Sequence, residues 1–189
     1  MPTYGFNDVR VGLKILVDGD PYNIVDADFV KPGKGQAFTR LKIKNMLNGR
    51  VTERTYKGSE TIEGADVVET NMTFLYSDGT DFHFMDPASY EQHSVAKDSV
   101  GDAAGFLKEQ DSCAVVLWNN RPISVSPPNH IVVEVVETDP GLRGDTSSGG
   151  TKPATLATGA VVKVPLFIQI GDIIKVDTRT ASYLSRAKE

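Results

Sequence analysis

The chain has 189 residues, of which 40% are hydrophobic and 24% are charged, and its formal net charge is -5. This composition is ordinary for a globular protein, and the length alone allows one or two domains. No apolar run is long enough for a membrane-spanning helix, and the N-terminus lacks a signal-peptide pattern, so we expect a cytoplasmic protein without membrane contact. The single cysteine, Cys113, cannot form an internal disulfide and is expected in the core.

Turn signals divide the chain into many short strands. Asp18-Gly19, Asn48-Gly49 and Asp78-Gly79 each lie between segments of alternating hydrophobicity, as two-residue hairpin turns do. One helix is expected over residues 100–110, where apolar side chains recur at helical spacing. Short strands at regular spacing predict an all-β chain made of small barrels.

The first strong break in the strand pattern is at residues 31–35, Lys-Pro-Gly-Lys-Gly. Pro32 fixes one φ angle, while Gly33 and Gly35 permit positive φ and place no side chain beside Lys34. We therefore expect a hairpin tip, shaped by Pro32, Gly33 and Gly35, that exposes Lys34. Such tips are common, and the alternative is that Lys34 is merely solvated.

The strand after this tip has a basic face. Over residues 36–44 the period of two puts Arg40, Lys42 and Lys44 on one face and apolar residues on the other. Residues 29–57, which include Lys31, contain eight Lys or Arg against one acid. Such a local charge is typical of a surface that binds a polyanion, nucleic acid above all. The alternative is a solvated strand face with no partner.

Charge also divides the chain into thirds. Residues 65–126 hold 3 basic and 10 acidic residues, whereas residues 1–64 hold 10 and 8, and residues 127–189 hold 7 and 7. A boundary is expected near Gly64, and the pair Pro127-Pro128 stiffens a second linker. We therefore expect three small barrels over 1–64, 65–126 and 127–189. The acidic middle barrel is expected to be a spacer or a contact for another protein, because its surface repels phosphate.

The sequence contains no pattern typical of an enzyme or a metal site. The three histidines, His83, His93 and His130, are too scattered for a local metal motif, and no phosphate-binding loop or nucleophile elbow occurs. We expect no catalytic residue, no metal and no cofactor. A hydrolase with residues converging on His83 or His130 is the least favoured alternative.

Two runs resemble the bacterial elongation factor P family. Residues 29–38 resemble the tip of that family, and its C-terminal signature is matched by Lys152, Ala154, Gly159, Val162, Val164, Pro165, Ile168 and Gly171. The resemblance covers the whole chain. It implies an SH3-like first barrel of the KOW type followed by two OB-fold barrels, arranged in an L that resembles tRNA. Two alternatives stay open: the elongation factor P-like paralogue and a generic KOW or OB RNA-binding protein.

The resemblance implies a translation factor that binds the 70S ribosome between the P and E sites and relieves stalling at consecutive prolines. Lys34 matches the tip residue that extends toward the CCA end of the P-site peptidyl-tRNA. The implied role is positioning, with the ribosome performing the chemistry, so no enzyme activity is expected. The members with a Pro-Gly-Lys-Gly tip that this chain most resembles have a β-lysyl group, sometimes hydroxylated, on this lysine. This implies a lysyl-tRNA-synthetase-like modifying enzyme as a partner of a monomeric factor. Other branches have an arginine with a rhamnose, which Lys34 excludes, or a lysine with a different aliphatic extension, which stays open.

The resemblance also implies RNA contacts in the third barrel. Gly144, Asp145 and Thr146, within an exposed loop expected over residues 139–151, match a motif near mRNA in the E site. Tyr183 and Arg186 match a Tyr-x-x-Arg pair associated with RNA contact. The alternatives are that Gly-Asp-Thr is an ordinary turn and that Tyr183 covers the core.

Overall fold

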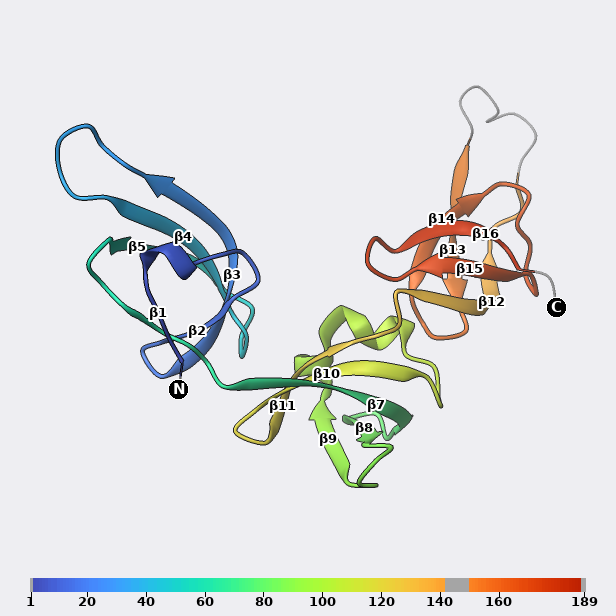
Figure 1. Ribbon diagram of the computed structural model, residues 1–189. Coiled ribbons are helices and arrows are strands. Elements are labelled where there is room, and N and C mark those ends of the chain that lie inside the picture. Colours follow the sequence, from blue (N-terminus) through green and yellow to red (C-terminus); the bar gives the residue numbers. More distant parts are fainter. Residues whose placement is uncertain (1, 142–149, 188–189) are drawn as a thin grey trace. The chain divides into compact units, whose positions relative to one another are not determined.

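The computed structural model describes residues 2–141 and 150–187 as a chain built mainly of strands (Figure 1). The all-β class predicted from the sequence is confirmed. The chain divides into two compact units, Met1–Thr70 with Val115–Ser124, and Asn71–Ala114 with Val125–Glu189. The division into three contiguous domains, and the L-shaped arrangement implied by the resemblance, stay predictions.

The first sheet is an antiparallel meander of β2 (Lys14–Val17), β3 (Asp20–Val30), β4 (Phe38–Asn45) and β5 (Val51–Lys57). A separate pair joins β1 (Thr3–Tyr4) to β6 (Ile62–Glu63), and a 3-10 turn, η1 (Phe6–Asp8), follows β1. The predicted turn between β2 and β3 is present, and Asp18 and Gly19 both take positive φ, 52° and 87°, as a tight two-residue hairpin requires. The inward side chains form a core of Val9, Ile15, Val17, Ile24, Leu41, Ile43 and Ile62.

The second sheet has the strand order β11-β10-β7-β8-β9. Its members are β7 (Val67–Ser77), β8 (Asp81–Met85), β9 (Gln92–Ala96), β10 (Ser112–Trp118) and β11 (Arg121–Ser126).

The helix predicted over residues 100–110 is wrong in its limits. A single α-helical turn, α1 (Lys97–Val100), comes first and is followed by a 3-10 segment, η2 (Gly101–Phe106). Gly101 has a φ of 59° and a ψ of -138°, which ends the α geometry at Val100. The sequence pattern located the helical region but could not show this break.

The third sheet closes into a barrel with the order β12-β13-β14-β16-β15. Its strands are β12 (His130–Thr138), β13 (Thr151–Leu156), β14 (Val161–Pro165), β15 (Ile173–Asp177) and β16 (Ser182–Arg186). Every second side chain is buried in β12 from Ile131 to Val135 and in β14 from Val162 to Val164, so the period of two that predicts strands also predicts which residues fill this barrel.

Within the second compact unit, η2 packs against this barrel. The Ala160 backbone N–H donates to the Gly105 carbonyl at 3.2 Å, and Phe106 is buried among the core residues of the barrel. A Cβ atom on Gly105 would lie 3.1 Å from the Ala160 Cβ, so a glycine permits this close approach. No described helix is long and apolar enough to cross a membrane.

Candidate functional site at the hairpin tip

The loop between β3 and β4 extends beyond the sheet as a hairpin tip (Figure 1). Residues 31–36 are all exposed. Gly35 takes a φ of 114°, a value that favours glycine, and a Cβ atom built on Gly33 would meet nothing within 4 Å. Lys34 therefore stands between two positions without side chains and is open to solvent. The sequence predicts this exposure, and the structure has it.

The base of the tip is held by hydrogen bonds to the segment that follows β5. The Gly58 N–H donates to the Ala37 carbonyl at 2.8 Å, and the Gln36 side-chain amide donates to Ser59 Oγ at 2.9 Å. A Cβ atom at Gly58 would lie 3.2 Å from the Ala37 oxygen. Within the described residues, positions 31–35 make no hydrogen bond of their own. The tip is thus anchored at its base and unbonded at its end.

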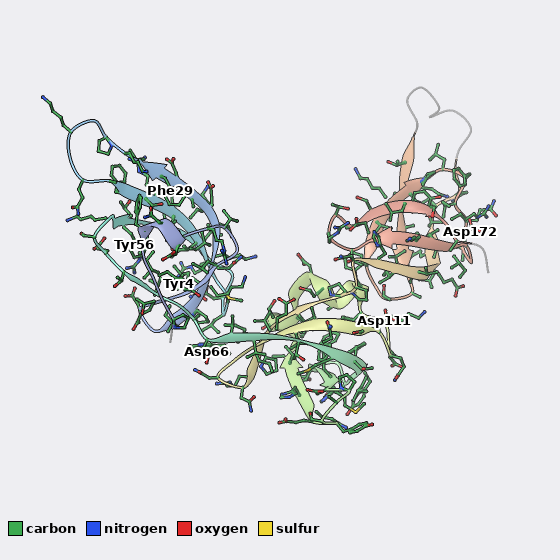
Figure 2. The ribbon with its side chains drawn as sticks, in the orientation of Figure 1. Tyr4, Phe29, Tyr56, Asp66, Asp111 and Asp172 are labelled. Carbon is green, nitrogen blue, oxygen red and sulfur yellow. The ribbon has the colours of Figure 1, made fainter. Side chains whose placement is uncertain are left out.

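An aromatic contact supports the same base. Phe29, near the end of β3 (Figure 2), meets Phe6 of η1 edge to face, with ring centroids 5.5 Å apart and an interplanar angle of 86°. Phe29 is still 44% exposed. Edge-to-face pairs stabilise beyond their buried area, so this contact helps to hold the end of β3 against η1.

The basic face of β4 is present, but the sequence did not predict the acidic residues that lie beside it on β3 and β5. Arg40, Lys42 and Lys44 are exposed, whereas the intervening Thr39, Leu41 and Ile43 are fully buried.

The strand register adds carboxylates beside these cations. Asp28 lies opposite Arg40, and Lys42 lies between Asp26 and Glu53. Directly opposed residues of an antiparallel pair share a face, so the local excess of positive charge is smaller on this face than along the sequence. In the described part of the chain, Arg40 and Lys42 form no ion pair. Arg40 instead lies 5.6 Å from the centre of the Phe38 ring.

The predicted third-barrel contacts are either outside the described residues or already engaged. Gly144, Asp145 and Thr146 lie outside the described residues. Arg186 forms an ion pair with Asp172, and this hydrogen bond, with one from the Gln169 backbone, lowers the pKa of the Asp172 carboxyl. Tyr183 is half-buried and packs against the barrel core.

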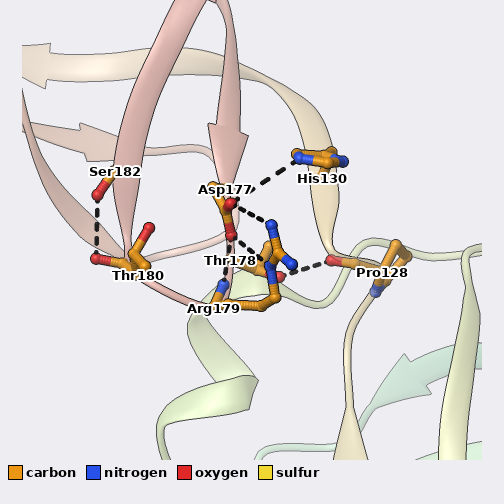
Figure 3. A network of polar contacts seen from close by, with 7 residues as sticks. All are labelled: Pro128, His130, Asp177, Thr178, Arg179, Thr180 and Ser182. Atoms are coloured by element: carbon orange, nitrogen blue, oxygen red, sulfur yellow. Dashed lines mark hydrogen bonds and ion pairs between the residues drawn. The ribbon is translucent and has the colours of Figure 1, made fainter.

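A polar network that the sequence did not predict surrounds Asp177 at the end of β15 (Figure 3). Arg179 donates to both carboxylate oxygens of Asp177, at 3.1 Å and 2.7 Å, and the His130 Nε2 lies 3.8 Å away. The hydrogen bonds from Arg179 lower the pKa of the buried Asp177 carboxyl from 3.8 to about 2.

The residue after Asp177 binds the chain that enters this barrel. Thr178 Oγ1 donates to the Pro128 carbonyl at 2.6 Å. The network therefore ties the predicted Pro127-Pro128 linker to the third barrel.

Other groups with potential chemistry are structural or unsupported by a pocket. Burial raises the pKa of the Cys113 thiol to about 12, so a thiolate nucleophile does not form near neutral pH. His83 lies between Asp78 and Ser94 in the second sheet, at 2.9 Å and 3.0 Å. A pocket of about 850 Å³ beside η2 has neither His83 nor His130 in its lining. No group of three potential metal ligands occurs in the described ranges.

Comparisons with known families match nearly the whole chain. Residues 6–62 match the model described as "Elongation factor P (EF-P) KOW-like domain", residues 67–125 match the "Elongation factor P (EF-P) OB domain" model, and residues 131–186 match "Elongation factor P, C-terminal". The chain is 55% identical over 188 residues to elongation factor P of Pectobacterium atrosepticum, covering 100% of both.

Solved structures support the fold alone. Eukaryotic translation initiation factor 5A from Methanococcus jannaschii matches with a TM-score of 0.58 and 20% identity, over 67% of this chain and 92% of that one. A translation initiation factor eif-5a family protein from Naegleria fowleri matches with a TM-score of 0.51 and 12% identity, over 66% and 94%. With the family models, they agree with an SH3-like KOW-type barrel followed by two OB-fold barrels.

Proposed function

The chain belongs to the elongation factor P family of translation factors, and from this premise we propose that it binds the 70S ribosome between the P and E sites. There it stimulates peptide bond formation and relieves stalling at consecutive prolines. The proline ring constrains φ and the chain around it, so the reacting groups are seldom aligned. Lys34 contacts the CCA end of the peptidyl-tRNA and restricts its movement, while the ribosome performs the chemistry without a catalytic residue, metal or cofactor from this chain.

The observation that supports this role is the contrast between the end and the base of the tip. Lys34 is exposed between glycines, whereas Gln36 and Ala37 are hydrogen-bonded to the segment after β5. A hairpin loop with Lys34 at its end fits an RNA-lined cavity, because the ammonium group donates up to three hydrogen bonds to phosphate and sugar oxygens. An anchored base limits how far that ammonium group moves.

We further propose that Lys34 receives a β-lysyl group, with or without hydroxylation, from a lysyl-tRNA-synthetase-like enzyme. The extension lengthens the side chain and adds a second amine. The open space around Gly33 and the exposure of the whole tip suit a lysine that must enter the active site of a modifying enzyme.

The remaining RNA contacts are proposals of the same kind. Lys31, Arg40, Lys42 and Lys44 would meet tRNA or ribosomal RNA phosphates. In the third barrel, Tyr183 and Arg186 would contact RNA, and Gly144, Asp145 and Thr146 would lie near mRNA in the E site. Arg186 would have to exchange its Asp172 ion pair for a phosphate. We propose a cytoplasmic, monomeric factor with barrels over 1–64, 65–126 and 127–189.

The test is a toeprint assay on a message encoding three consecutive prolines. Protein purified from its native source is compared with Lys34→Ala, Lys34→Arg and the control Lys97→Ala, whose lysine is exposed on α1. We expect relief of stalling by the native protein and by Lys97→Ala, none by Lys34→Ala, and little by Lys34→Arg, which keeps a charge but cannot be lysylated. Intact mass of the native protein reports the β-lysyl group directly.

Each other outcome is informative. Full relief by Lys34→Ala would remove Lys34 from the mechanism. No relief by the native protein would contradict the polyproline role and favour the paralogue. Full relief by Lys34→Arg would show that charge suffices without the modification.

A further inference from the structure

The outer face of β8 and its neighbours holds an ordered aromatic pair. The Tyr76 ring stacks on the His83 imidazole, with centroids 4.5 Å apart and 22° between the planes. Asp78 Oδ2 lies 2.9 Å from His83 Nε2, and Ser94 Oγ lies 3.0 Å from Nδ1. Both ring nitrogens are therefore engaged, and the fixed imidazole supports one face of Tyr76.

Asp81 extends this surface along β8. It lies two residues before His83 and so projects from the same side of the strand. We name Tyr76, Asp78, Asp81, His83 and Ser94 the aromatic-acidic face. Tyr76 is 47% exposed, and His83 covers one side of its ring.

The charge of this region is mainly negative, and the first cation after β9 is Lys97, whose backbone N–H donates to the Thr80 carbonyl at 3.1 Å. Residues 71–96 contain no Lys or Arg and four carboxylates, those of Asp78, Asp81, Asp86 and Glu91. Hydrogen bonds from the Asp81 N–H, the His83 side chain and the Thr80 N–H lower the pKa of Asp78 to about 2, so this group is a fixed anion near neutral pH.

We propose that the aromatic-acidic face binds an arginine side chain of a basic protein segment. A planar guanidinium stacks on the exposed part of the Tyr76 ring, and the negative charges of Asp78 and Asp81 attract it to this face. Lysine fits less well, because its compact and strongly hydrated ammonium cannot stack. Nucleic acid is disfavoured, because its phosphates would meet the carboxylates of Asp78 and Asp81. The proposal does not depend on Lys34.

Amide chemical-shift mapping on the full-length chain tests this. The probes are a capped peptide of alternating arginine and glycine, the matching lysine-glycine peptide, and oligouridine RNA. We expect the arginine peptide to shift the amides of the aromatic-acidic face most, and the lysine peptide to bind there several-fold more weakly. Oligouridine should leave this face unchanged.

Variants separate stacking from charge. Tyr76→Leu should lower the affinity for the arginine peptide about three- to fivefold. Asp81→Asn should also lower this affinity and should make it less dependent on salt. Tyr76→Phe should keep the affinity of the native chain. The control is Tyr90→Leu, which removes a ring that is 72% exposed in the same sheet region and should change nothing. The proposal is wrong if both peptides bind equally, if shifts spread over all carboxylates, if RNA binds this face, or if Tyr76→Leu binds as tightly as the native chain.

Discussion

The hairpin tip and the Asp177 network both place charged side chains where strands end, yet their bonding is opposite. At the tip, residues 31–35 make no hydrogen bond within the described chain, and Lys34 is surrounded by solvent. Around Asp177, Arg179 binds both carboxylate oxygens and Thr178 binds the Pro128 carbonyl (Figure 3). Lys34 at the tip is available to a partner, whereas Arg179 is already bound within the chain and stabilises the fold.

This difference bears on which predicted contacts are ready for RNA. Lys34 and Lys42 have no internal ion pair among the residues described, but Arg186 is bound to Asp172. An exposed ion pair contributes little to stability, so Arg186 can exchange partners at small cost. The lesson is that charge along the sequence overstates the charge that a partner meets.

The largest expected effect on stability comes from breaking the Asp177 network. Asp177→Ala removes the carboxylate that accepts hydrogen bonds from the side chain and the backbone N–H of Arg179. The end of β15 then loses its hydrogen bonds to Arg179. We expect Tm, measured by thermal unfolding, to fall by several degrees. Asp66→Ala is the control, because Asp66 is exposed. An unchanged Tm for Asp177→Ala would mean that the network does not stabilise the barrel.

Low pH should weaken the same network, because it protonates Asp177. Asp177 has a folded-state pKa of about 2 against an ordinary value of 3.8, so it stabilises the fold above the ordinary value and loses that contribution as pH falls through the folded value. We expect the free energy of unfolding, measured with urea, to decline between about pH 4 and about pH 2. Asp177→Asn should flatten this decline in part, since Asp78 and Asp172 also have lowered pKa values. An identical slope for the variant would contradict the assignment.

A smaller effect is expected at the base of the tip. Phe29→Leu keeps an apolar side chain but removes the edge-to-face contact with Phe6, and should cost about 1 kcal/mol in urea unfolding. It should also speed hydrogen exchange of the Gly58 amide, which bonds Ala37. Tyr90→Leu, far more exposed, serves as the control. If exchange at Gly58 is unchanged, the aromatic contact does not hold the base.

Features that depend on local sequence were predictable, and those that depend on register were not. The burial of Leu41 and the exposure of Lys42 follow from a period of two, and the tip follows from its proline and glycines.

The features missed involve residues that only the folded chain brings together. Asp28 meets Arg40 through a hairpin whose register includes a shift between Ile24 and Asp26. His130 and Asp177 meet through the pairing of β12 with β15. The stack of Tyr76 on His83 needs the register of β7 with β8, in which these two residues pair next to a shift between Phe74 and Tyr76. A bulge changes every later partner, and no local pattern in this sequence marks it.

The smallest expected change in stability is at the residue with the largest proposed role. Lys34→Ala removes a side chain that is exposed and has no bonded partner in the described chain, so Tm should stay within about 1 °C of the native value. The same variant should abolish relief of polyproline stalling. A large fall in Tm would contradict the exposed tip, because only a side chain that contacts the rest of the fold can stabilise it. Unchanged stability with lost activity would separate the two kinds of charged site, since it places the role of Lys34 in contacts with a partner and not within the chain.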